Sequence, residues 1–129
     1  MTNSLTLRLL PDDLAICRLA EDMPFPDWLP VTGFMAFIRA PGELTLVCAE
    51  KYLPEGVVSE PGWRALGVVE KLDFSQVGVL ASLASPLARA GVSIYVISTY
   101  DTDYILVREA NLEQARAALL EAGHRIQGM

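Results

Sequence analysis

The chain has 129 residues, of which 52% are hydrophobic and 20% are charged. This length allows one domain of ordinary size or two very small ones, and this apolar content excludes a disordered or low-complexity chain. Sixteen acidic against ten basic residues give a net charge of -6. That sign is wrong for holding a phosphate backbone, so nucleic acid is not an expected partner.

The sequence also carries no signal for export or membrane insertion. No stretch of roughly 18 apolar residues occurs, and segment 1–13 lacks the basic start and long apolar run of a signal peptide. We therefore expect a cytoplasmic protein without membrane contact. Cys17 and Cys48 lie in apolar, strand-like segments, where thiols of such a protein are typically buried and reduced rather than paired or catalytic.

The first half of the chain predicts strands and little helix. The predicted strands are 5–10, 15–19, 34–39 and 43–48. The last two flank Pro41-Gly42, which is typical of a hairpin turn. Three prolines between positions 24 and 30 leave room only for a short turn around 27–29. Segment 53–63, with its prolines and glycines, is expected to connect the two halves.

The second half predicts the order strand, helix, strand, strand, helix, strand. The segments are 65–72, 77–90, 92–98, 104–107, 112–122 and 124–126. Ser75 or Asp73 is the expected N-cap of the first helix, and Asn111 that of the second. Pro86 lies inside the first helix and is expected to kink or restart it. This order is the ferredoxin-like, or split βαβ, arrangement.

Two neighbouring features favour binding of an amino-acid zwitterion. The start of the helix at Val77 presents unpaired backbone N–H groups that suit a carboxylate, and Gly78 allows a ligand close to the backbone. Asp101 and Asp103 would point the same way on a regular strand and attract an ammonium or guanidinium group. Structural roles are the alternatives: Ser75 as a helix cap, Gly78 in close packing, and the two aspartates as turn residues.

Three segments, 78–88, 90–94 and above all 98–107, resemble a known family. They resemble the small tandem ACT-domain proteins of bacteria, whose C-terminal module is similar to the cytosolic arginine sensor of the TORC pathway. Segments 43–48 and 62–64 resemble the family's first module. The resemblance implies two ACT modules side by side, a regulatory rather than catalytic role, and an amino-acid ligand at an interface between modules.

The resemblance also implies which residues bind the ligand. They are Ser75, Gln76, Val77 and Gly78 in the loop that enters the helix, and Thr99, Tyr100, Asp101 and Asp103 in the hairpin region. The arginine sensor has an acidic residue near the position of Gln76. The implied ligand is therefore an amino acid, without arginine being specified.

Other chemistries have weak or no signals. Asp101 and Asp103 alone would make a poor cation site, so no metal is expected. His124, the one histidine, follows a helix end, where a capping or strand role suffices. A nucleophile elbow, a Walker loop and a dinucleotide-binding glycine motif are all missing from the sequence, so neither catalytic residues nor a cofactor are expected.

The sequence thus predicts an α+β protein of two ferredoxin-like (βαββαβ) ACT modules with antiparallel sheets. The first module, 1–62, is expected to be degenerate and irregular with a reduced helix, and the second to span 63–129. The expected function is regulatory binding of an amino acid between modules, in a homodimer. The alternative is a ligand-free adaptor for a metabolic enzyme or transporter. A small hydrolase or isomerase on the same fold is the third hypothesis.

Overall fold

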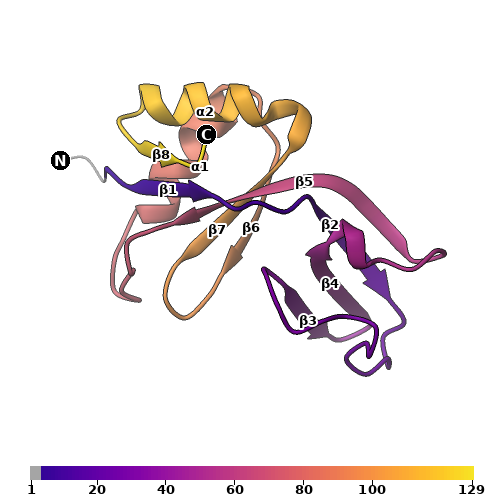
Figure 1. Ribbon diagram of the computed structural model, residues 1–129. Helices are drawn as coiled ribbons and strands as arrows, with labels where there is room; N and C mark the ends of the chain where they lie inside the picture. The colour runs from indigo at the N-terminus through magenta and orange to yellow at the C-terminus, as the bar shows by residue number, and fades with distance from the viewer. Residues whose placement is uncertain (1–3) are drawn as a thin grey trace. The chain divides into compact units, whose positions relative to one another are not determined.

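The computed structural model describes residues 4–129, which form two compact units (Figure 1). One unit consists of residues 12–63, and the other of residues 64–129 together with 4–11. The strands are β1 (Thr6–Leu9), β2 (Leu14–Leu19), β3 (Ala36–Ala40), β4 (Glu43–Ala49), β5 (Val58–Val68), β6 (Ile94–Ser98), β7 (Asp103–Arg108) and β8 (Arg125–Gln127). The helices are α1 (Val79–Arg89) and α2 (Leu112–Glu121), with short 3-10 helices at Glu50–Tyr52 and Glu109–Asn111. Among residues 4–129, no helix is long and apolar enough to span a bilayer.

Unit 12–63 is an antiparallel sheet in the order β3, β4, β2 and the first part of β5. The predicted hairpin between β3 and β4 is confirmed: Ala40 pairs with Glu43, and Gly42 has φ +77°, which glycine adopts without strain. One face of the sheet buries a small apolar core. Cys17 and Cys48 are free and buried in that core, as predicted, and their mutual hydrogen bond and burial raise the pKa of the Cys17 thiol.

The predicted connector 53–63 is wrong over its second half. Residues 58–63 belong to β5 and pair with β2, for example Val58 with Arg18 and Ser59 with Cys17. The Pro61-Gly62 pair that suggested a loop is accommodated by a β-bulge: the β2–β5 register shifts between Leu14 and Ile16, and Gly62 has φ +83°.

The second unit places strands β8, β1, β5 and β7 side by side in that order, with β6 next to β7. Strand β1 pairs antiparallel with β5 but parallel with β8, so the predicted antiparallel sheets contain one parallel pair. The N-terminal strand thus completes the sheet of the C-terminal unit. The predicted partition into 1–62 and 63–129 stays a prediction about ACT modules, whereas the compact units place residues 4–11 with the C-terminal part.

Both helices cover one face of this sheet, as Figure 1 shows. The core between them contains Leu7 and Leu66 from the sheet, Leu83 and Leu87 from α1, and Leu119 from α2, all 0% exposed. The mixed α+β class and the predicted order of elements in this half are confirmed.

Pro86 lies within α1, yet the helix continues from Val79 to Arg89 without the predicted restart. A proline has no N–H, so the carbonyl of Ser82, four residues earlier, loses its helical donor. His124 replaces that donor: its Nε2 lies 2.9 Å from the Ser82 carbonyl oxygen, and its Nδ1 accepts the N–H of Leu5 at 3.1 Å. His124 is 4% exposed. The side chain of His124 thus links α1 to the start of β1, while its backbone N–H bonds the Leu119 carbonyl at 3.0 Å and caps the end of α2, as predicted.

Replacing His124 should reveal this link. His124→Leu is expected to lower the free energy of unfolding by about 2 kcal/mol, because the Ser82 carbonyl and the Leu5 N–H both lose a buried partner. Urea denaturation measures this change. In a Pro86→Ala background, residue 86 regains an N–H for Ser82, so the same substitution should cost less. An equal loss in both backgrounds would contradict the explanation.

Candidate functional site

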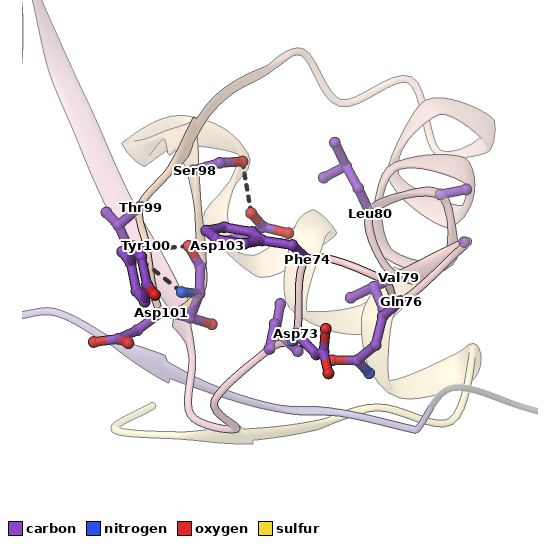
Figure 2. A pocket seen from close by; sticks show the side chains of 14 residues that line it. Asp73, Phe74, Gln76, Val79, Leu80, Ser98, Thr99, Tyr100, Asp101 and Asp103 are labelled. Carbon is purple, nitrogen blue, oxygen red and sulfur yellow. Dashed lines mark hydrogen bonds between the residues drawn. The ribbon is translucent and has the colours of Figure 1, made fainter.

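A pocket of about 380 Å³ lies in the second unit, between the loop that leads into α1 and the turn that joins β6 to β7 (Figure 2). Its lining residues are Leu72, Asp73, Phe74, Gln76, Gly78, Val79, Leu80, Ala81, Ser98, Thr99, Tyr100, Asp101, Thr102 and Asp103. The walls therefore come from the two segments that the sequence analysis singled out.

Six of the eight predicted binding residues line the pocket: Gln76, Gly78, Thr99, Tyr100, Asp101 and Asp103. Ser75 and Val77 are absent from the lining, although they lie in the same loop. The side chain of Val77 is almost fully exposed. The structure thus brings the two predicted groups together, while the binding role of each residue stays a prediction.

The loop before α1 contains a compact polar turn. The Asp73 carboxylate accepts hydrogen bonds from the backbone N–H and the hydroxyl of Ser75, both at 2.8 Å, and these bonds lower the pKa of Asp73. The side-chain Oε1 of Gln76 accepts the Asp73 N–H at 2.5 Å. Because this turn uses the polar groups of Asp73 and Ser75, the prediction that either one caps the helix is wrong.

The helix begins at Val79, with Gly78 as the N-cap residue, and no described side chain caps it. Gly78 has φ +81°, so its main requirement is a left-handed backbone conformation. The first helical bond joins the Ser82 N–H to the Gly78 carbonyl at 3.0 Å. The N–H groups of residues 79–81 have no acceptor within the helix, and they lie at the positive end of its dipole beside the pocket.

The opposite wall is a tight turn closed by Thr99 and Thr102. The Thr99 N–H donates to the Thr102 carbonyl at 2.8 Å, and the Thr102 N–H donates to the Thr99 hydroxyl at 3.2 Å. Just outside the turn, the Ser98 hydroxyl donates to the Asp103 carboxylate at 2.6 Å, as Figure 2 shows. Asp103 is half-buried and lines the pocket, so its carboxylate is accessible there to a cationic group.

The two aspartates do not share a direction, contrary to the prediction. Asp103 is the first residue of β7 and meets Ser98, whereas Asp101 lies in the turn and pairs with Lys71 at 3.4 Å. The prediction assumed a regular strand through both residues. The chain instead turns at residues 99–102, so Asp101 lies in the turn while Asp103 lies on β7 and pairs with Ser98 of β6.

An aromatic pair contributes to the apolar part of the site, together with Leu72, Val79, Leu80 and Ala81. The rings of Phe74 and Tyr100 meet edge to face, with centroids 5.0 Å apart and an interplanar angle of 77°. The remaining lining residues were not among the predicted binding residues: Leu72, Asp73, Phe74, Val79, Leu80, Ala81, Ser98 and Thr102. For Phe74, the available signal was a large aromatic residue inside an otherwise polar loop.

The charge of the lining favours a ligand that carries a cation. Among the described residues that line the pocket, three are aspartates and none is basic. Over residues 4–129, no cluster of three or more histidine, cysteine or acidic side chains is arranged to hold a metal ion. The site therefore offers backbone N–H groups and the Asp73 carboxylate on one wall, the carboxylates of Asp101 and Asp103 on the other, and exposed rings beside them.

The polar turn can be tested without a ligand. Ser75→Ala removes the hydroxyl bond to Asp73, so the pKa of Asp73 should rise toward its ordinary value. An NMR titration of the Asp73 carboxyl carbon measures this shift. Ser85→Ala, at an exposed position of α1, is the matched control and should leave the pKa of Asp73 unchanged. The bond would have no influence on Asp73 if both variants titrate like the unchanged protein.

Comparison with known proteins identifies relatives for both parts of the chain. Residues 58–121 match the family model of the ACT domain, and residues 12–56 match a second model described as an N-terminal domain. The cytosolic arginine sensor for mTORC1 subunit 1 of Bos taurus is 34% identical over 85 residues, which cover 60% of this chain and 26% of that protein. The match thus spans about a quarter of the length of this curated relative.

Solved structures of other proteins have a similar fold. A crystal structure of a protein from Agobacterium tumefaciens has a TM-score of 0.91 and 33% identity, and the match covers 97% of this chain and 93% of that one. The ligand-free regulatory subunit of aspartate kinase from Thermus thermophilus has a TM-score of 0.63 over 93% of this chain and 99% of that one, with 13% identity, which shows a shared fold. The family resemblance is confirmed: the chain belongs to the ACT domain family, which its residues 58–121 represent.

Proposed function

We propose that this protein binds a free amino acid in the pocket between the start of α1 and the β6–β7 turn, and that binding serves regulation. The observation that carries the proposal is the pairing, across one pocket of about 380 Å³, of an uncapped helix start with the Asp103 carboxylate. The volume lies within the range of about 300–1,000 Å³ typical of small-ligand sites.

The chemistry of the two walls matches the two ends of an amino acid. A ligand carboxylate at the start of α1 would accept hydrogen bonds from the N–H groups of residues 79–81 and interact favourably with the helix dipole. A ligand ammonium would meet Asp103, which the Ser98 hydroxyl orients. Phe74 and Tyr100 would contact the ligand side chain.

The relatives support a regulatory role. Membership of the ACT family, the arginine sensor and the regulatory subunit of aspartate kinase all favour sensing over catalysis. The name of the arginine sensor makes arginine the first ligand to test, and its cytosolic location supports the predicted cytoplasmic one. The predicted homodimer, and the predicted position of the ligand between modules, stay predictions.

A protein-interaction adaptor is the second candidate function. The observation that favours it is the exposure of Phe74, Val77 and Tyr100, which are 78%, 90% and 77% exposed beside the pocket. Apolar side chains gathered this way are typical of surfaces that bind a partner. The two functions differ in whether an amino acid alone stabilises the protein.

Thermal unfolding against the twenty amino acids, with arginine first, tests the proposal. A ligand present at 100 times its Kd adds about 2.7 kcal/mol of stability, which raises Tm by several degrees. We expect a selective rise with one amino acid. Stabilisation by none at millimolar concentration would contradict ligand binding and favour the adaptor.

A substitution locates the ligand. Asp103→Asn keeps the shape and an acceptor for Ser98 but removes the charge, so affinity for the ligand ammonium should fall roughly tenfold or more. Isothermal titration calorimetry measures the Kd. Glu113→Gln removes a carboxylate from an exposed ion pair on α2, away from the pocket, and should leave the Kd unchanged. Equal affinity in both variants would place the ligand elsewhere.

A further inference from the structure

Thr102 lines the pocket, and its side chain bonds the chain segment that comes just before the opposite wall. Its hydroxyl lies 3.0 Å from the carbonyl oxygen of Val68 and 3.1 Å from that of Glu70, so its single proton is shared between two acceptors. Thr102 is half-buried. The hydroxyl therefore joins the β6–β7 turn to the chain segment that leads into α1.

The two acceptors are themselves held by the sheet. Val68 is the last residue of β5 and pairs with Leu7 of β1. The next N–H, that of Val69, donates to the Thr6 carbonyl at 2.8 Å, and the Glu70 carboxylate accepts the Thr6 N–H at 3.0 Å. Because these residues are fixed on β1, the Thr102 hydroxyl positions the turn against the sheet.

Thr102 is bonded to the other arm of the β6–β7 turn, so a shift of Thr102 would move the whole turn. Its backbone N–H and carbonyl are both bonded to Thr99, on the other arm of the turn. Asp101 precedes Thr102 and Asp103 follows it. Moving Thr102 would therefore displace the two carboxylates of this wall relative to the helix start.

Other contacts between the two walls are a backbone hydrogen bond, an ion pair and a ring contact. The Leu72 N–H donates to the Asp101 carbonyl at 2.6 Å, which no side-chain substitution removes directly. The Lys71–Asp101 ion pair joins two largely exposed side chains, so solvent screens it. The Phe74–Tyr100 ring contact is also exposed. The Thr102 hydroxyl is thus a half-buried side-chain link between the β6–β7 turn and the segment that leads into α1.

We infer that Thr102 is a positioning residue: its hydroxyl sets the distance between the acidic turn and the start of α1, and thereby the fit of the pocket to a ligand. This inference rests on the proposed function for its effect on affinity. Its effect on the loops does not depend on any ligand, so the two can be tested separately.

The ligand-independent test is amide hydrogen exchange on the full chain, followed by NMR. Thr102→Val keeps the branched shape but removes the donor, and it should speed exchange of the Leu72 amide roughly tenfold relative to the Leu119 amide in α2. Thr102→Ser should restore the protection. Thr45→Val makes the same chemical change at a half-buried threonine of β4, in the other unit, and should leave Leu72 unaffected.

The binding test uses L-arginine as the probe in calorimetry. Thr102→Val should raise its Kd roughly fivefold to tenfold, and Thr102→Ser should stay within about twofold of the unchanged protein. Unaltered Leu72 exchange in Thr102→Val, no rescue by Thr102→Ser, or an equal effect of Thr45→Val would overturn the inference. If the unchanged protein does not bind arginine, arginine fails as the ligand, and Leu72 exchange alone decides the role of Thr102.

Discussion

The contact on which the unit of residues 4–11 and 64–129 depends is the hydrogen bond between His124 and the carbonyl of Ser82. Pro86 deprives that carbonyl of its helical donor, and a buried carbonyl without a partner costs about 1–3 kcal/mol, a large share of the stability of a small domain. By donating to Ser82 in a part-buried bond and accepting from Leu5 in a buried one, His124 joins α1 to β1. His124 therefore fixes the position of the first turn of α1, which forms part of one wall of the pocket.

The N-terminus of the same helix has no side-chain cap among the described residues. Asp73 and Ser75 are residue types that commonly cap helices, yet here they bond each other within the preceding turn. Gly78 then turns the chain into the helix without supplying a side-chain oxygen. Under the proposed function the ligand carboxylate would serve as the missing cap. Binding would then stabilise α1 directly, which couples occupancy of the pocket to the order of the helix.

Sequence patterns predicted the elements of the second half well, because the helical periodicity around Leu83 and Leu119 and the alternation in 94–98 reflect burial on one face. They failed where partners are distant in sequence. The parallel place of β1 beside β8 and the bond from His124 to Ser82 depend on contacts across more than 40 residues. The Pro61-Gly62 pair misled for the opposite reason, since a bulge and a loop have the same local signature.

Under the proposed function, the lining also bears on which amino acid would fit. The Oε1 of Gln76 is engaged by the Asp73 N–H, so the amide can offer the pocket a donor but little acceptor capacity. A ligand with an ammonium and a second cation needs two acceptors, and Asp103 supplies one of them. Asp101 can supply the other if Lys71 moves away, and that exposed ion pair is worth at most about 1 kcal/mol. A second positive charge on the ligand is therefore compatible with this pocket at small electrostatic cost, even without an acidic residue at position 76.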